Sequence, residues 1–212
     1  MAETAARADV EVAGPERLIY FSDAVIAIAI TLLALELPTP TSGVHGDAGV
    51  LAFFGEHAEE YLAFLISFGA VAMHWLIHQR LFRHAVGLDG RLIRWNLLWL
   101  LMIVLMPCTT KLLTSEVDAF PVQFTVYAAD QALAGLFLLL AVADLRRFHL
   151  LRADAPAEVI SDAMEFMTAV AAMFVLSIPV AFVTNWALLC WLLLPVVRAI
   201  VRFVGRRISA TA

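Results

Sequence analysis

The segment from Arg17 to Leu37, RLIYFSDAVIAIAITLLALEL, constrains the fold more than any other part of the chain. Its only acid away from the ends is Asp23. A helix of about twenty apolar residues crosses a hydrocarbon layer of roughly 30 Å. We therefore predict that this segment spans a membrane. Taken alone, it also fits a signal-anchor helix with one Asp near the membrane interface.

The composition assigns the whole chain to the same class. Of its 212 residues, 62% are hydrophobic and only 16% are charged, whereas a soluble domain carries about 25% charged residues. The protein is therefore expected in a membrane. Its two cysteines, Cys108 and Cys190, lie inside apolar runs, and we interpret them as buried thiols rather than as a disulfide pair.

Five further apolar segments have the length of membrane spans, and we place them at 58–81, 92–113, 121–145, 159–182 and 186–203. The predicted fold is all-α: a polytopic membrane protein with six transmembrane helices per subunit and no soluble domain. The predicted domains are an N-terminal tail at 1–16, a six-helix transmembrane domain at 17–205 and a C-terminal tail at 206–212.

The basic residues set the predicted orientation. All Lys and Arg residues except Lys111 lie before the first span, between the second and third, between the fourth and fifth, or around the end of the sixth. Basic residues concentrate on the cytosolic side of a membrane. Both termini and both tails are therefore predicted to be cytosolic, and the expected location is a cell membrane, such as the inner or plasma membrane of a prokaryote.

The first span opens with the pattern Arg17-x-x-x-Phe21-Ser22-Asp23, followed by AVIAIAITLLALEL. This pattern resembles the signature of the transmembrane protein 175 family of potassium channels, in its prokaryotic branch. With the six-span layout, the resemblance covers nearly the whole chain. It implies a potassium-permeable cation channel rather than an enzyme, with potassium and other monovalent cations as permeant ions and no cofactor.

Animal members of this family carry two six-span repeats in one chain, whereas this sequence contains one. The dipeptide Ser161-Asp162 repeats part of the first-span pattern, but the following residues differ. The resemblance therefore implies that several identical subunits form one pore in the lipid bilayer, as a homotetramer. No nucleic-acid partner is expected, because basic residues gather only where the topology requires them.

One stripe of the first span is the candidate pore lining. Ile28, Leu32 and Leu35 share a helix face, with Thr31 beside them. Their spacing alone also fits ordinary helix packing. The resemblance implies that these three residues form an apolar pore constriction with polar support from Thr31, since the sequence has no TVGYG segment to supply a carbonyl filter. Animal members have Ser where Ala27 stands here, a departure that bears on potassium selectivity.

A second candidate site is a layer of polar residues near the predicted cytosolic ends of the first three spans. Depth along the helices predicts that Ser22, Asp23, His74, Trp75 and Asn96 share this layer. A buried carboxylate needs hydrogen-bond donors, which Trp, His and Asn supply. The resemblance implies that the layer knits the helices of a subunit together, with Arg17 as a further member. Direct ion coordination by the same residues is the alternative.

Intramembrane acids support a different function. Asp130 and Gln131 lie inside the fourth span and Glu165 inside the fifth, and such residues often mark coupling-ion or proton sites. An ion-coupled secondary transporter is therefore the alternative to a channel, and a purely structural membrane subunit is a third class. His74 and His78 are spaced like a zinc-ligating pair but lack a third ligand, so we predict no metal site.

The six-span arrangement predicts which connections face the cytosol. A reporter enzyme active only in the cytosol should work when fused at either terminus or near Gly87, between the second and third spans. The same reporter should fail near Gly43, between the first and second spans. Reporter activity is compared at matched expression of the fusions. A cytosolic signal from the fusion near Gly43 would contradict the arrangement.

Overall fold

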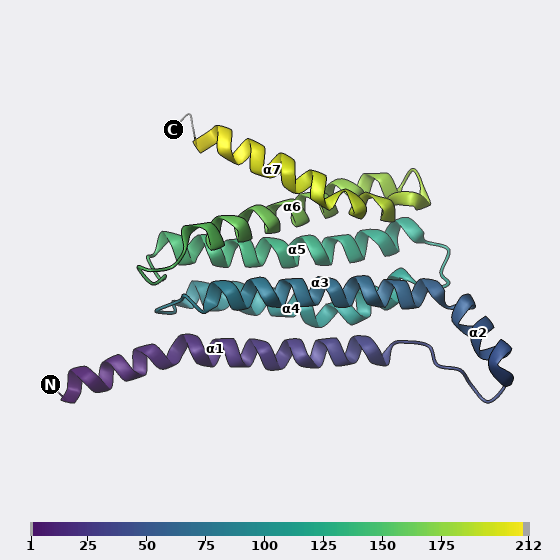
Figure 1. The fold of residues 1–212 in the computed structure, drawn as a ribbon, viewed down its shortest axis with the longest axis horizontal. Helices are drawn as coiled ribbons and strands as arrows, with labels where there is room; N and C mark the ends of the chain where they lie inside the picture. Colours follow the sequence, from purple (N-terminus) through teal and green to yellow (C-terminus); the bar gives the residue numbers. More distant parts are fainter. Residues whose placement is uncertain (1, 210–212) are drawn as a thin grey trace.

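The computed structural model describes the backbone of residues 2–209 and the side chains of residues 14–158, 160–184, 187–191, 193–194 and 196–203. The described chain is helical throughout and forms a bundle of long helices that lie side by side (Figure 1). Its elements are α1 (Ala2–Leu35), α2 (Gly46–Glu56), α3 (Ala58–Phe82), α4 (Gly90–Leu113), α5 (Phe120–Arg147), α6 (Ala157–Ala181), the 3-10 helix η1 (Asn185–Leu193) and α7 (Leu194–Ser209).

Five helices in the described part of the chain are long and apolar enough to cross a membrane. They correspond to the first five predicted spans, and the boundaries of the second to fifth agree closely with the prediction. The candidate spans cover Gly14–Leu35, Ala58–Phe82, Gly90–Leu113, Phe120–Arg147 and Ile160–Ala181. The apolar length of each segment therefore identified these spans correctly.

The sixth predicted span, 186–203, is divided between η1 and α7. The helix α7 has 16 residues and carries Arg198 and Arg202, so it is too short and too charged to count as a span by itself. Together, η1 and α7 bring the chain back toward the end of the bundle where α1 begins (Figure 1). A sixth crossing and the cytosolic placement of both termini stay predictions.

Two further differences concern the N-terminal end and the connection after the first span. The helix α1 begins at Ala2, so the segment predicted as a tail at 1–16 is continuous with the first span, and Pro15 lies inside the helix. The connection after Pro38 contains α2, which the sequence analysis did not predict. Met1 and residues 210–212 of the predicted C-terminal tail lie outside the described residues.

The core of the bundle lies between α4, α5 and α6. Large buried side chains such as Trp99 and Met106 of α4, Leu138 of α5 and Met167 of α6 fill it. The helices α5 and α6 approach closely at Gly135, where an added Cβ would lie 3.5 Å from the Cβ of Ala171. Small residues allow such close approach between membrane helices, because packing rather than the hydrophobic effect drives their association.

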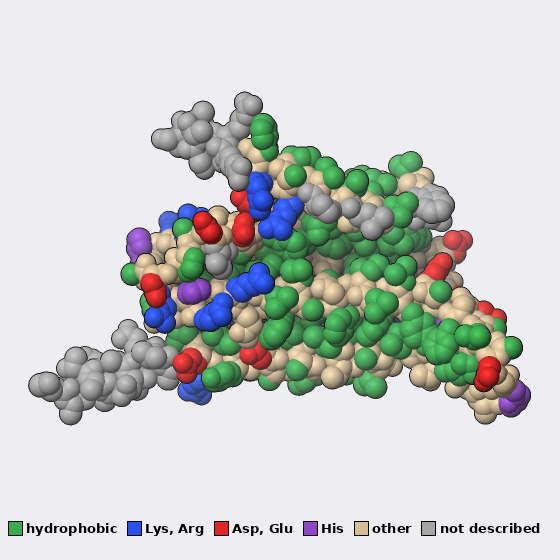
Figure 2. Space-filling model, viewed as in Figure 1, with side chains coloured by type: hydrophobic (Ala, Val, Ile, Leu, Met, Phe, Trp, Pro, Cys, Tyr) green, Lys and Arg blue, Asp and Glu red, His purple; other side chains and the backbone are tan. Residues whose placement is uncertain are grey.

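The described surface of the single chain is rich in exposed apolar side chains, as lipid or a neighbouring subunit requires (Figure 2). Cys108 is one of the exposed residues, and Cys190 is half-buried; both are free. The interpretation of Cys108 as a buried thiol is therefore wrong. An apolar run in a membrane helix includes positions that face lipid, so its apolar character does not indicate burial within the protein.

Candidate functional site

The helix α1 has two different faces. Ile26, Ala29 and Leu33 are buried on the side that packs against α4 and α3. On the other side, Ile28 is 59% exposed and Leu35 is 78% exposed. Because α1 lies at one edge of the bundle (Figure 1), this second face has no partner among the described residues of its own chain.

The residues of the predicted pore stripe all lie on this uncovered face. Ile28, Leu32 and Leu35 are exposed, and so is Thr31 beside them. The Thr31 hydroxyl donates to the carbonyl oxygen of Ile28 at 2.7 Å. Its oxygen keeps lone pairs that can accept a hydrogen bond or contact a cation. The stripe is therefore an apolar surface with one hydroxyl group, that of Thr31, near its middle.

Asp23 of α1 is joined to α3. Its Oδ1 atom accepts a hydrogen bond from Nε1 of Trp75 at 2.9 Å and another from Nε2 of Gln79. Trp75 is 39% exposed and Asp23 is half-buried, so this contact lies near the surface of the subunit. Hydrogen bonds to an ionised acceptor are stronger than neutral ones, and they fix the rotation of α1 against α3.

A second, fully buried connection involves α1, α3 and α4 together. Nδ2 of Asn96 donates to Oγ of Ser22 at 3.0 Å. Oδ1 of Asn96 lies 2.9 Å from Nε2 of His78, so His78 donates through that nitrogen. Ser22 in turn donates to the carbonyl oxygen of Leu18 at 2.8 Å. One amide side chain of α4 thus joins the other two helices.

His74 has a separate partner in the same region. Its Nδ1 accepts a hydrogen bond from Nε1 of Trp99 at 3.2 Å. The ring of His78 stacks on Trp99, with centroids 4.6 Å apart, and on Phe82, with centroids 4.1 Å apart. Both histidines are therefore held by hydrogen bonds, and His78 also by ring stacking. The described residues contain no group of three His, Cys, Asp or Glu residues that could hold a metal ion.

Five predicted members of the polar layer thus take part in hydrogen bonds at the junction of α1, α3 and α4, while Asp23 contacts neither His74 nor Asn96. Arg17 is exposed, and the structure brings it to no hydrogen-bond or ion-pair partner among the described residues. Three further residues of this junction, Gln79, His78 and Trp99, were not predicted. A helical spacing signal was available for two of them, since Gln79 and His78 follow Trp75 and His74 by four residues.

The intramembrane acids have separate partners. Asp130 is buried, and its Oδ2 accepts from Oγ1 of Thr109 at 3.4 Å. Glu165 accepts from Nε of Arg202 at 2.8 Å. The amide of Gln131 is buried without a hydrogen-bond partner among the described residues. Asp130 and Glu165 therefore do not form one shared site by direct contact.

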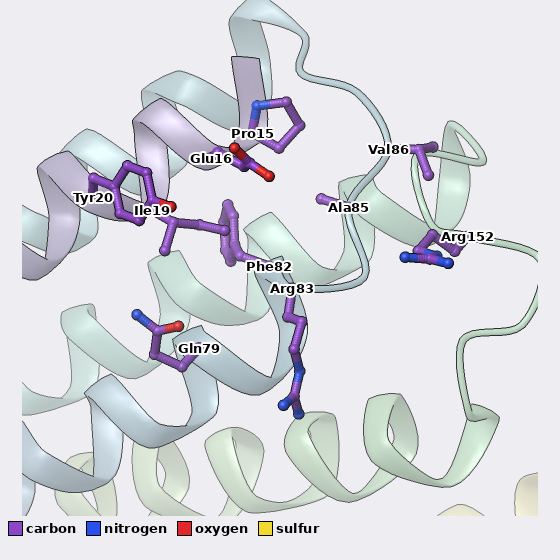
Figure 3. A pocket seen from close by; sticks show the side chains of 10 residues that line it. All are labelled: Pro15, Glu16, Ile19, Tyr20, Gln79, Phe82, Arg83, Ala85, Val86 and Arg152. Atoms are coloured by element: carbon purple, nitrogen blue, oxygen red, sulfur yellow. The ribbon is translucent and has the colours of Figure 1, made fainter. Parts of the chain in front are cut away.

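A hollow of about 450 Å³ lies beside the polar layer, between α1, the end of α3 and the connection that follows it (Figure 3). Gln79 lines it, so the contact between Gln79 and Asp23 stands at its wall. Charged side chains of both signs, Glu16, Arg83 and Arg152, also line the hollow. They form no cluster typical of a metal or catalytic site.

Comparison with known proteins identifies relatives of the chain. A family model described as "Endosomal/lysosomal potassium channel TMEM175" matches residues 17–107, a segment that contains every candidate pore and polar-layer residue. A protein named as a potassium channel of Chamaesiphon minutus is 33% identical over 126 residues, which are 59% of this chain and 60% of that protein. One from Streptomyces collinus is 34% identical over 147 residues, 66% of this chain and 70% of its own length.

The fold also has a solved counterpart. The crystal structure of a lysosomal potassium-selective channel TMEM175 homolog from Chamaesiphon minutus matches with a TM-score of 0.67 and 24% sequence identity. The match covers 92% of this chain and 98% of that one. The arrangement of helices is therefore shared over nearly the full length of both chains.

The two parts of the polar layer predict different costs of mutation. Asn96→Leu leaves the buried His78 without its acceptor and Ser22 with only its own bond to Leu18, so we expect it to destabilise the protein by about 1–3 kcal/mol. Asp23→Ala should cost less, because Trp75 retains access to the surface, and Asp23→Asn should restore part of the loss. Thermal unfolding of the purified variants in detergent measures the order. If Asp23→Ala unfolds like the unmodified protein and loses only ion flux, direct ion handling replaces the structural role.

Proposed function

The chain belongs to the TMEM175 family, and from this premise we propose that it is a potassium-permeable cation channel of a cell membrane. The relatives described above are named as potassium channels, and their names support potassium as the permeant ion. The five membrane-length helices make the chain a multi-pass membrane protein. The observation that carries the proposal is the uncovered apolar face of α1 within the segment that matches the family.

In this proposal, α1 lines a central pore. Ile28, Leu32 and Leu35 are exposed in the single subunit, although they lie in the most hydrophobic of the candidate spans. Identical copies arranged around a rotation axis would each present the same face to that axis, and closed symmetric rings are the usual form of soluble homo-oligomers. In a homotetramer, the three side chains from each copy form a narrow neck, which excludes water when closed and gates by dewetting.

Thr31 gives this neck its polar support. Its hydroxyl is exposed between the apolar side chains and is oriented by its bond to the Ile28 carbonyl. A ring of such hydroxyls replaces part of the water that a cation loses in the neck. Ala27 stands beside Ile28 without a polar atom in its side chain, so Thr31 is the polar contribution of this stretch to discrimination between potassium and sodium.

The polar layer holds the pore helix in its rotation. Ser22 and Asp23 precede Ile28 on α1 by fewer than two helical turns and are joined to α4 and α3. A change in these bonds would rotate α1 and move the stripe away from the axis. The layer therefore acts as a structural support, and exposed Arg17 is left to contact lipid headgroups or a neighbouring subunit.

Ion flux tests the proposal against a transporter and an inert subunit. Liposomes that contain the purified protein should show passive, electrogenic cation flux under a potassium gradient, and weaker flux under a matched sodium gradient. A transporter would require an opposing gradient of a coupling ion. No flux in either condition, with correctly assembled protein, would contradict the channel.

The neck predicts a specific effect of a polar substitution. Ile28→Asn should wet the constriction and lower its barrier to ions, which increases flux and reduces discrimination between potassium and sodium. Assembly should survive, because a pore-facing side chain has few packing partners. If Ile28 instead packs in a core, the buried amide would destabilise the protein, and loss of assembly would contradict the pore assignment.

Cysteine substitutions provide the matched control. Single cysteines at positions 28, 32 and 35 should react with silver ions or crosslink between subunits, whereas cysteines at 26, 30 and 33 should not. Ile26 and Leu33 are buried against the neighbouring helices, so the control positions lie on a different face of the same helix from the stripe. Equal reactivity of the two sets would exclude this stripe as the pore lining.

A further inference from the structure

A groove runs along the bundle between α3 on one side and α6, η1 and α7 on the other. Its middle part has a volume of about 240 Å³, and its two ends have about 390 and 300 Å³. Ile66 and Trp191 line both the middle and one end, while Met73 and Phe166 line both the middle and the other end. The three parts therefore adjoin one another along the bundle. Figure 2 shows this face, with Lys and Arg side chains gathered toward the end of the bundle where the chain begins.

The middle of the groove is suited to a hydrocarbon chain. Its wall consists mainly of apolar side chains of α3 and α6, among them Ile66, Met73 and Val170. Gly69 of α3 leaves additional room, because a Cβ placed there would meet no atom within 4 Å. An apolar, membrane-facing groove with free space along its wall takes up acyl chains without any polar group losing its partners.

One end of the groove carries a net positive charge, because two arginines line it together with one acid, Asp162. Arg80 of α3 and Arg198 of α7 line this end. Nε of Arg198 is buried without a hydrogen-bond partner among the described residues, and its guanidinium lies 5.4 Å from the ring centroid of Phe166. Arg80 has no acidic partner in the described part of the chain. A buried donor of this kind calls for an acceptor.

The nearby acids do not supply that acceptor. Asp162 and Glu165 both pair with Arg202, at 3.3 and 2.8 Å. The two acids exceed the single charge of Arg202 by one, so these two acids and the three arginines together keep a net charge of +1, and neither acid bonds to Arg80 or Arg198. Guanidinium groups bind carboxylate and phosphate oxygens in paired geometry, so an anionic ligand fits this end, and phosphate is the anion that a membrane phospholipid supplies.

The distance from the open wall at Gly69 to the arginine end of the groove matches the length of a phospholipid within one leaflet. Along α3, Gly69 and Arg80 are separated by roughly 16 Å at 1.5 Å per residue. One leaflet of the hydrocarbon core is about 15 Å thick, half of the roughly 30 Å total. We propose that the groove binds an anionic phospholipid, with its phosphate at Arg80 and Arg198 and an acyl chain along α3 past Gly69. Free phosphate would use only the arginine end.

Native mass spectrometry of the purified full chain tests the headgroup site. Titration with phosphatidylglycerol should give a retained lipid adduct, and phosphatidylcholine should be retained far less. The double variant Arg80→Gln with Arg198→Gln should reduce the phosphatidylglycerol adduct roughly tenfold, because both phosphate contacts are lost. The control double variant, Arg94→Gln with Arg147→Gln, removes the same charge at exposed positions outside the groove and should bind as the unmodified protein does. Equal loss in both double variants would overturn the site in favour of general charge attraction.

The acyl-chain part is tested by filling the groove. Gly69→Leu places a side chain in the open space of the wall and should weaken retention of phosphatidylglycerol severalfold without disturbing the fold. Gly55→Leu on α2 is the control, since a Cβ there also meets no atom within 4 Å and the position lies outside the groove. Unchanged retention in Gly69→Leu, or displacement of the lipid by millimolar inorganic phosphate, would overturn the lipid site. Equal retention of the two lipids would overturn it as well.

Discussion

The hydrogen bonds of Asn96 are the interaction on which the arrangement of the first three long helices depends. Apolar surfaces give membrane helices little reason to choose one another over lipid, so packing and interhelical hydrogen bonds decide their contacts. Asn96 donates to Ser22 of α1 and accepts from His78 of α3, and all three side chains are buried. Separating these helices would leave Asn96 and His78 without hydrogen-bond partners in hydrocarbon, and Ser22 with only its bond to Leu18. The position of α1 against the bundle is therefore set by these hydrogen bonds and not by packing alone.

A fixed registry gives α1 its functional asymmetry. Once Ser22 faces α4, helical periodicity places Ile26, Ala29 and Leu33 on the packed side and Ile28, Leu32 and Leu35 on the uncovered side. The same few polar residues thus determine both how the subunit holds together and which face of α1 is left uncovered. This explains why the signature of the first span concentrates polar residues at its start and leaves the rest apolar.

The sequence predicted those features that depend on length and depth. Apolar length located five spans, and depth along the helices brought Asp23 and Trp75 to the same level. Depth along a helix does not give its rotation, so the pairing of Asp23 with Gln79 and of His74 with Trp99 was missed, although the four-residue spacing from Trp75 pointed to Gln79. The exposure of Cys108 was missed for the same reason. The division of the last predicted span into η1 and α7 was also missed, because hydropathy over 186–203 reports apolar length and not where a helix is interrupted.

The bundle presents two apolar surfaces that differ in what can cover them. The stripe of α1 is a convex row of side chains without charge, and a copy of itself matches it by symmetry. The groove beside α3 ends at Arg80 and Arg198, which line it together with one acid, Asp162, and keep a net positive charge. Like charges would meet if a second copy brought the same end of its groove to this position, and repulsion disfavours that contact. A lipid supplies both an apolar chain and a phosphate, so in the two proposals above the groove would face lipid and the stripe of α1 would face other copies.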